Sequence, residues 1–333
     1  MEENVSREIV QQMLDRARLS EGEVESRLKS ALDPVYWERL NPGFTVGRQT
    51  NGEIPETNPL NIENVYELRK SIERKGYFQT DPILPEPVLK PIRDCIERLK
   101  AEQWPPVFVF VYDQVWQLSN APSLIRLRSE FLGPGCKRTS RVWCFYVAPA
   151  PGSKGFAPHA DGFGRADRLT VWIALSDATL ENGCIYLIPQ DLAPDAAKTY
   201  YSKNFNQQDL MVLLQSCRAL PAKAGSILGW NFNVMHWSSF SNRPAGPRIS
   251  LAVEFIAAQA EPDPDELPLL DGPGLPTFPQ RIFGIAQGIL GYYPHEPRLN
   301  IYRDLALLLK KHGSGPTLPT ETSSTPSGAT EPV

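Results

Sequence analysis

The spacing of apolar residues divides the chain into a helical first part and a strand-rich middle. Residues 61–75 and 86–102 carry apolar residues at intervals of three and four, which predicts two amphipathic helices. Short runs of β-branched and aromatic residues follow, and they predict strands at 107–112, 141–147, 169–175, 184–188, 226–230 and 249–255. Helical spacing returns at residues 123–132, 279–290 and 299–311.

Turn-forming residues separate the expected strands. Asn182-Gly183 between two of them predicts a hairpin with a type I′ turn, because both central residues of that turn need a positive φ. The 32 prolines, about twice the average usage, add further breaks. Many short strands punctuated by Gly and Pro predict a mainly β fold with flanking helices, closed as a jelly-roll or sandwich.

The same pattern predicts three parts of the chain. Residues 1–60 form a helical and irregular extension, and residues 61–312 form a single domain. Its β core spans about 105–258, and a C-terminal lid with helices occupies residues 259–312. Residues 313–333 are rich in Ser, Thr, Pro and Gly and are expected to be disordered.

Composition and charge narrow the function classes. The net charge of −4 comes without the basic stripe of a nucleic-acid binder. The five cysteines are scattered and form no Cys-x-x-Cys pair, which argues against a disulfide framework or a structural zinc site. The charged N-terminal segment resembles no signal peptide, and no apolar run reaches the ~20 residues of a membrane span. We expect a cytoplasmic protein that acts on a small molecule, without nucleic-acid or membrane partners; its oligomeric state is open.

Three residues form a candidate metal site. His159-Ala160-Asp161, with His236 75 residues after Asp161, supplies two imidazoles and one carboxylate. This is the 2-His-1-carboxylate set that holds Fe(II) by one face and leaves the opposite positions open. On a strand, His159 and Asp161 would share a face. The alternative is that each histidine is an ordinary solvated or hydrogen-bonded residue.

Arg248 and Ser250 form a candidate anion site. They are also two residues apart, and they begin an apolar run whose members should be buried. A planar guanidinium suits a carboxylate, and a buried arginine normally needs an acidic partner. A bound 2-oxoglutarate would be that partner. A surface ion pair is the alternative for Arg248, and Arg243 is the rival anchor.

The motifs together resemble those of the phytanoyl-CoA dioxygenase family. The matching pieces are PHADG (158–162), the segment 169–189, PAKAGSILGW (221–230) and HWSSFSNRPAGPRISL (236–251), within a resemblance that covers roughly residues 61–258. The resemblance implies a cupin-like double-stranded β-helix and a non-haem dioxygenase that uses Fe(II), 2-oxoglutarate and O2. It makes His159, Asp161 and His236 the metal ligands and catalytic residues, and Arg248 with Ser250 the site for 2-oxoglutarate.

The expected reaction is oxidation, most simply hydroxylation, of a C–H bond in a metabolite, with release of succinate and CO2. Asp161 retains the carboxylate that related halogenases replace by a small residue, which favours hydroxylation. Gln190-Asp191-Leu192 stand where the family often has Gly-Ser-His, so the local loop should differ. Phe145, Trp172 and Trp230 are candidates for the pocket wall, or for the core.

Two other functions stay open on the sequence alone. A non-catalytic metal-binding β-barrel, acting as a scaffold or sensor, would keep the three ligands but leave Arg248 without a task. A zinc hydrolase could use the same ligands, but it would need a general base, for which the sequence offers no obvious candidate.

Overall fold

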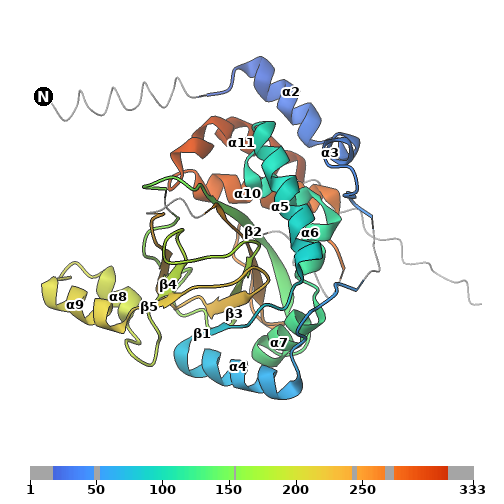
Figure 1. Ribbon diagram of the computed structural model, residues 1–333. Helices are drawn as coiled ribbons and strands as arrows, with labels where there is room; N and C mark the ends of the chain where they lie inside the picture. Colours follow the sequence, from blue (N-terminus) through green and yellow to red (C-terminus); the bar gives the residue numbers. More distant parts are fainter. Residues whose placement is uncertain (1–17, 49–52, 154, 242–245, 267–273, 314–333) are drawn as a thin grey trace, which may run out of the picture.

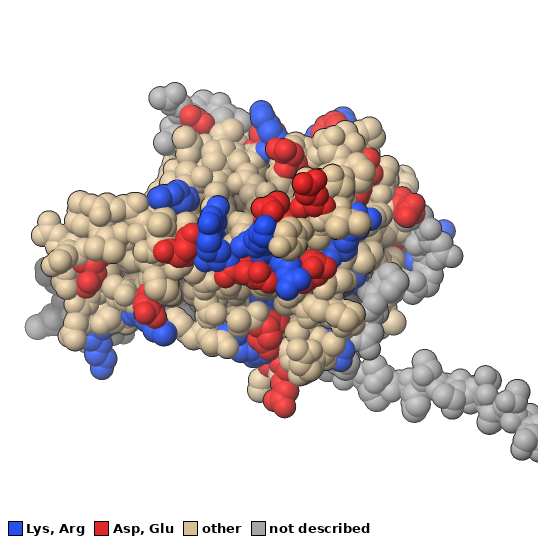
Figure 2. Space-filling view, turned by 90° about the horizontal axis from the view of Figure 1, so that it is seen from below, with Lys and Arg blue, Asp and Glu red and all other residues tan. Residues whose placement is uncertain are grey.

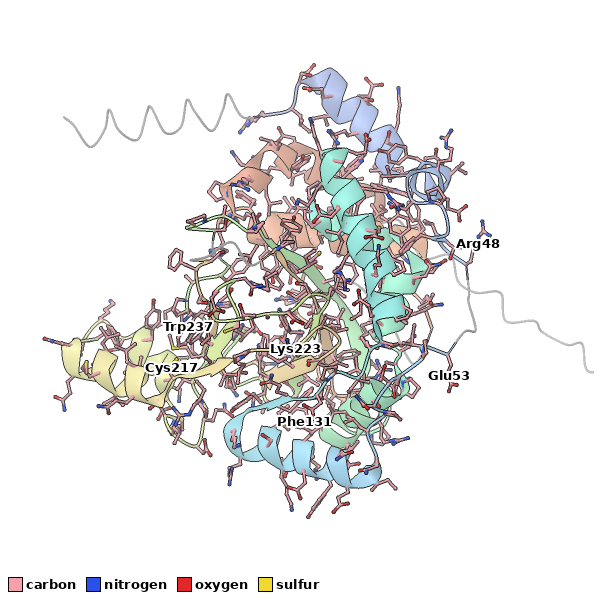
Figure 3. The ribbon with its side chains drawn as sticks, in the orientation of Figure 1. Arg48, Glu53, Phe131, Cys217, Lys223 and Trp237 are labelled. Atoms are coloured by element: carbon pink, nitrogen blue, oxygen red, sulfur yellow. The ribbon has the colours of Figure 1, made fainter. Side chains whose placement is uncertain are left out.

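The computed structural model describes residues 18–48, 53–153, 155–241, 246–266 and 274–313 (Figure 1). The tail predicted to be disordered falls outside these residues from 314 onward. Arg48 and Glu53 border one of the gaps, at the outer edge of the molecule (Figure 3).

Two antiparallel sheets form the centre of the molecule. The five-stranded sheet has the order β1-β6-β3-β8-β2, and the three-stranded sheet has the order β5-β4-β7. The strands are β1 (Tyr77–Gln79), β2 (Lys137–Val147), β3 (Arg168–Ala174), β4 (Ile185–Leu187), β5 (Arg218–Leu220), β6 (Ile227–Asn231), β7 (His236–Ser238) and β8 (Arg248–Ile256). Trp172 and Leu228 of the larger sheet share one buried cluster with Leu187 and Leu220 of the smaller sheet. The facing sheets confirm the predicted jelly-roll.

Helices flank the sheets, and five of them lie near the predicted ranges 61–75, 86–102, 123–132, 279–290 and 299–311. They are α2 (Glu21–Ala31), α3 (Pro34–Leu40), α4 (Ile62–Lys75), α5 (Glu86–Ala101), α6 (Asp113–Leu118), α7 (Pro122–Leu132), α8 (Ala196–Tyr200), α9 (Gln207–Ser216), α10 (Phe278–Tyr292) and α11 (Arg303–Gly313). Helix α10 packs on β2 and α11 packs on α10, whereas α8 and α9 project from the side of the sheets (Figure 1). Gly76 ends α4 with a φ of 82°, a left-handed conformation that glycine adopts without strain.

One strand prediction is wrong. Residues 107–112 lie mostly in a 3-10 helix, η1 (Pro106–Val111), and not in a strand. Its residues from Val107 to Val111 are all buried, so the run lacks the alternation that distinguishes a half-buried strand. Pro105 and Pro106 fix the backbone at its start. The β core therefore begins at β2, apart from the short edge strand β1.

The helix predicted at 299–311 begins as a second 3-10 helix, η2 (Pro297–Tyr302), before α11.

The prediction of a type I′ hairpin at Asn182-Gly183 is also wrong. Strand β3 pairs with β6 and β8, and β4 pairs with β5 and β7, so the two flanking strands lie in different sheets. Gly183 has a φ of 92°, but Asn182 is not among the described non-glycine residues with positive φ. The Asn182 side chain instead accepts from the Thr179 amide at 2.7 Å and donates to the Asp177 carbonyl at 2.9 Å. Asn182-Gly183 therefore lies in a loop that connects the two sheets.

The N-terminal segment packs against the rest of the molecule. Trp37 is fully buried, and its ring lies 4.9 Å from Trp104 and 5.3 Å from Phe108. Asp113 is also buried and pairs with Arg281 of α10 at 2.6 Å. It accepts hydrogen bonds from the amides of Gly47 and Arg48, both at 3.0 Å. The division at residue 60 stays a prediction.

The face on which α4 lies carries mixed charge. Figure 2 shows Lys and Arg interspersed with Asp and Glu there, without an extended patch of one sign. Arg69 of α4 pairs with Glu73 at 2.8 Å and with Glu130 of α7 at 2.7 Å. None of the helices described is long and apolar enough to cross a membrane.

Candidate active site

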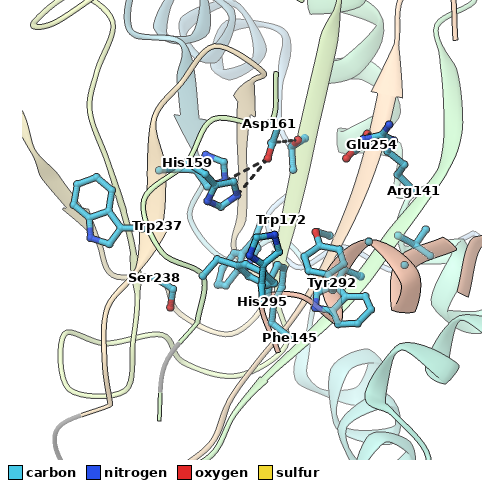
Figure 4. Close-up of a pocket in the computed structure, with 18 of the residues that line it drawn as sticks. Arg141, Phe145, His159, Asp161, Trp172, Trp237, Ser238, Glu254, Tyr292 and His295 are labelled. Atoms are coloured by element: carbon cyan, nitrogen blue, oxygen red, sulfur yellow. Dashed lines mark hydrogen bonds and ion pairs between the residues drawn. The ribbon is translucent and has the colours of Figure 1, made fainter. Parts of the chain in front are cut away.

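A cavity of about 670 Å³ opens between the two sheets and the C-terminal end of α10. Its lining includes His159, Asp161, His236 and Arg248, four of the five residues proposed from the sequence. Ser250, the fifth, is fully buried behind Arg248 and does not line the cavity. Figure 4 shows Ser238 and Trp237 on one side of the His159–Asp161 pair, and Glu254 and Arg141 on the other.

The backbone fixes the two histidines opposite each other. His159 donates its amide to the His236 carbonyl at 3.0 Å, and His236 donates its amide to the His159 carbonyl at 2.8 Å. This reciprocal pair is an antiparallel bridge outside the regular strands. Gly162 donates its amide to the Phe232 carbonyl at 3.1 Å and holds the chain just beyond Asp161. The segment around His159 therefore extends the ladder at the β7 edge.

Each imidazole turns one nitrogen to the backbone and the other to Asp161. Nδ1 of His159 lies 2.8 Å from the Ala157 carbonyl, and Nδ1 of His236 lies 3.1 Å from the Val234 carbonyl. A carbonyl only accepts, so each Nδ1 carries the proton and each Nε2 has a free lone pair. These Nε2 atoms lie 3.6 and 3.7 Å from Oδ1 of Asp161.

The two oxygens of Asp161 face different partners. Oδ2 accepts hydrogen bonds from Thr170 Oγ1 at 2.7 Å and from Trp230 Nε1 at 2.9 Å. Oδ1 faces the two histidines. One ligand atom from each of the three residues lies within 4.8 Å of the others. Metal ligands in proteins are commonly oriented by hydrogen bonds of this kind.

Burial sets the protonation of the group. It lowers the pKa of the His236 imidazole to about 4, which keeps the ring neutral. Burial opposes ionisation of Asp161, but the pKa of this carboxyl is lowered nevertheless. The two neighbouring imidazoles and the hydrogen bonds from Thr170 and Trp230 outweigh it. A carboxylate beside a neutral imidazole is the state in which these residues bind a cation.

Arg248 is a buried cation held by hydroxyl groups. Its side chain donates to Ser250 Oγ at 3.0 Å and to Ser238 Oγ at 2.7 Å, and the residue is 1% exposed. No carboxylate among the described residues forms an ion pair with it, and its Nε has no hydrogen-bond acceptor there. Burial lowers the pKa of Arg248 to about 10, so the guanidinium is charged at neutral pH. The acidic partner expected of a buried arginine is missing from the described chain.

A closely packed glycine and a second buried donor lie near Arg248. A Cβ at Gly155 would lie 2.5 Å from Ser238 Oγ and 3.0 Å from an Arg248 terminal nitrogen, so only glycine fits there. The Trp172 ring centroid lies 5.8 Å from the Arg248 guanidinium. Its indole Nε1 is buried and has no acceptor among the described residues.

Several secondary expectations can be checked against the structure. Phe145, Trp172 and Trp230 all line the cavity. His295 is exposed and also lines the cavity. The rival anchor Arg243 lies outside the described residues.

The sequence reasoning missed Ser238, Thr170 and Glu254. Two of them follow an alternation signal, because Ser238 lies two residues after His236 and Glu254 six residues after Arg248.

Comparisons with known proteins agree with this geometry. Residues 113–250 match the model of the family described as phytanoyl-CoA dioxygenase (PhyH). Among curated proteins, none matches the chain in sequence. The solved structure of the epimerase SnoN in complex with Fe3+, alpha ketoglutarate and nogalamycin RO is 20% identical, with a TM-score of 0.51. The alignment covers 62% of this chain and 91% of SnoN. EctD from S. alaskensis, solved with 2-oxoglutarate and 5-hydroxyectoine, is 17% identical over 63% of this chain and 79% of EctD, with a TM-score of 0.45.

SnoN supports the fold, and the family match supports the chemistry of the core. The resemblance inferred from the motifs is confirmed for the stretch that carries β2 to the start of β8. Residues 113–250, which include His159, Asp161, His236 and Arg248, thus match the model of the phytanoyl-CoA dioxygenase family.

Proposed function

We propose that this enzyme hydroxylates a C–H bond of a small-molecule metabolite and converts 2-oxoglutarate and O2 into succinate and CO2. His159, Asp161 and His236 would hold Fe(II), and Arg248 would hold the distal carboxylate of 2-oxoglutarate. The observation that carries the proposal is the meeting of both groups in one cavity: three ligand atoms within 4.8 Å of one another, and a buried arginine without a carboxylate.

The donor set fits Fe(II). Two neutral imidazole nitrogens and one carboxylate oxygen converge from one side, while the cavity lies on the other side. Each ligand residue has a second hydrogen bond that fixes its orientation: to Ala157 for His159, to Val234 for His236, and from Thr170 and Trp230 for Asp161.

The environment of Arg248 fits a dicarboxylic acid. Ser238 donates its hydroxyl proton to the Gly183 carbonyl at 2.9 Å, so toward Arg248 it acts only as an acceptor. It orients the guanidinium, as Ser250 does from behind, and leaves donors free for a carboxylate. Trp172 Nε1 is an additional buried donor for the same ligand.

The chain's own contribution is positioning and exclusion of water. Aromatic residues (Phe145, Phe156, Trp172, Trp230, Trp237 and Tyr292) supply most of the apolar wall of the cavity. Bound iron, with 2-oxoglutarate and O2, supplies the oxidising power that breaks the substrate C–H bond. The walls keep the substrate carbon near the metal and limit the access of bulk water.

A scaffold function and a zinc hydrolase are less well supported. A scaffold would gain nothing from burying Arg248 without a carboxylate, because burial of a cation is unfavourable. For a hydrolase, the acid nearest to the ligands in register is Glu254, opposite Thr170. Burial raises the pKa of Glu254 to about 8, so this carboxyl is protonated at neutral pH and unsuited to act as a general base.

The first test is anaerobic titration of the metal-free protein with Fe(II) and 2-oxoglutarate. We expect the weak visible charge-transfer band of the iron–2-oxoglutarate complex, and succinate when air is admitted. Asp161→Ala should lose the band through loss of metal, whereas Arg248→Ala should keep the metal and need far more 2-oxoglutarate.

A wild-type protein that binds the metal but never shows the band would overturn the proposal and favour the scaffold. Product mass settles the outcome of the reaction, because hydroxylation adds one oxygen atom and an epimerisation adds none.

A further inference from the structure

A second polar wall lines the cavity beside the proposed metal ligands. Arg141 of β2, Glu254 of β8 and Asp265 contribute charged groups there, and Gln287 of α10 contributes an amide. Thr170, whose hydroxyl binds Asp161, is the cross-strand partner of Glu254. Directly opposed residues on one face have Cβ atoms about 5 Å apart, so Glu254 lies beside the metal carboxylate. The proposed functions of the iron and 2-oxoglutarate sites do not use this wall.

Glu254 is the carboxyl that this wall leaves unsatisfied. Arg168 binds Glu266 through two hydrogen bonds, at 2.7 and 2.8 Å. Arg141 donates to Asp263 at 2.9 Å. The same two arginines approach Glu254 only to 3.8 and 4.0 Å, beyond hydrogen-bond distance.

Glu254 Oε2 is buried and has no hydrogen-bond donor among the described residues. The side chain keeps 16% of its surface accessible, and since Glu254 lines the cavity, this part faces the substrate space.

Carboxyl groups outnumber arginines around this residue. The connected ion pairs join three arginines (Arg141, Arg165 and Arg168) with five carboxyls (Asp167, Glu254, Asp263, Asp265 and Glu266). Lys310, another cation at the cavity, lies over the Phe283 ring at 5.7 Å. A bound cation would favour the ionised form of Glu254 and pair with it, whereas a neutral ligand would not.

An aromatic surface adjoins Glu254. Tyr292 stacks on Trp143 with ring centroids 4.1 Å apart, and Phe156 meets Tyr292 edge-on at 4.7 Å. The Tyr292 hydroxyl makes no hydrogen bond to another described residue and points toward the space between Asp161 and Glu254 (Figure 4). A carboxyl next to aromatic rings and a free phenol oxygen is a favourable setting for an ammonium group.

We propose that the substrate carries a protonated amine, which Glu254 receives between Arg141 and the Tyr292 ring, with an apolar body against the aromatic wall. This inference rests on the proposed function and names the substrate class of the same cavity. It places the nitrogen close to the metal ligands, so the oxidised carbon lies within a few bonds of the amine.

The test compares probes that differ only in one group: 4-phenylbutylamine, 4-phenylbutan-1-ol and 4-phenylbutanoate. Calorimetric titration into the full chain, loaded with Fe(II) and 2-oxoglutarate under nitrogen, measures the three affinities. We expect the amine to bind about ten-fold or more tightly than the alcohol, with the carboxylate weakest. Glu254→Gln, which keeps the shape but cannot ionise beside a bound ammonium group, should abolish the preference for the amine.

Glu73→Gln is the matched control, because it makes the same substitution at an exposed position on α4. Equal binding of amine and alcohol to the wild type, absence of binding by both, or a preference that survives in Glu254→Gln would each overturn the inference. The charge-transfer band is recorded for every variant and reports the iron site separately. Repeating the titrations on the metal-free protein tests Glu254 even if the band never forms.

Discussion

At the scale of single residues, Asp161 shows how one side chain serves two purposes. Thr170 and Trp230 occupy Oδ2, so only Oδ1 remains directed at the histidines. The hydrogen bonds also favour the ionised form of the carboxyl. Orientation and charge of this proposed ligand are thus set by neighbours on β3 and β6.

Removing one of these neighbours should weaken metal binding, although none of the proposed ligands is substituted. Thr170→Val keeps the shape and loses the hydroxyl, and we expect the Fe(II) affinity to fall about 10- to 100-fold. Competition with a chromophoric chelator measures it. Thr199→Val, the same change on α8, should leave the affinity at the wild-type value. An unaltered affinity in Thr170→Val would show that Trp230 alone orients the carboxylate.

Substitution of Arg248 should weaken the binding of 2-oxoglutarate separately from that of the metal. Truncating one member of a buried charge pair costs about 2–5 kcal/mol, so Arg248→Ala should weaken 2-oxoglutarate binding about 30-fold or more. Arg248→Lys keeps the charge but not the planar fork. Its affinity for 2-oxoglutarate should therefore lie between those of the wild type and Arg248→Ala. Calorimetry on the Fe(II)-loaded protein measures both. Fe(II) affinity should stay unchanged, and a parallel loss of metal would contradict separate roles.

At the scale of elements, β8 carries much of the site by simple alternation. Ile249, Leu251, Val253 and Phe255 face the hydrophobic core, so the residues between them face the other way. Three of those, Arg248, Ala252 and Glu254, line the cavity. This parity follows from the sequence once the strand is recognised, so the cavity-facing position of Arg248 could be predicted.

Other elements could not be predicted because their determinants are tertiary. The buried run from Val107 to Val111 has no period to distinguish a strand from a helix, and its neighbours α5 and α10 decide the outcome. Asn182-Gly183 has the composition of a hairpin, but the strands beside it pair elsewhere. The unsatisfied state of Glu254 depends on which carboxyls Arg141 and Arg168 bind, and no local pattern encodes that choice.

The Asp113–Arg281 pair links α6 to α10 and to the N-terminal segment. Both side chains are at most 1% exposed, and removing one partner leaves an uncompensated buried charge. We expect Asp113→Ala to lower the free energy of unfolding by about 3–5 kcal/mol. Urea denaturation measures it. Asp94→Ala, which removes the exposed partner of Lys90, should cost less than about 1 kcal/mol. Similar values for both variants would count against a linking role.

At the scale of the whole molecule, Glu254 makes stability depend on pH. Its pKa is raised from 4.5 to about 8, chiefly by burial, so the folded state holds this proton more tightly than the unfolded state. The stabilisation is fully present below the unfolded pKa and is lost as pH rises through the folded pKa. Between pH 5 and 8, the unfolding free energy should therefore fall by up to about 1.4 kcal/mol per pH unit relative to Glu254→Gln. Urea titrations across this range would contradict the prediction if the two profiles ran parallel.

The two backbone hydrogen bonds between His159 and His236 have a consequence for the protein before it binds iron. Backbone hydrogen bonds set the spacing of the two imidazoles, so no metal ion is needed to bring the two segments together. Folding and metal loading are then separate events. A protein from which a chelator has removed the iron should keep its fold and bind iron again. Iron supply would then regulate the activity of the folded enzyme without changing its amount.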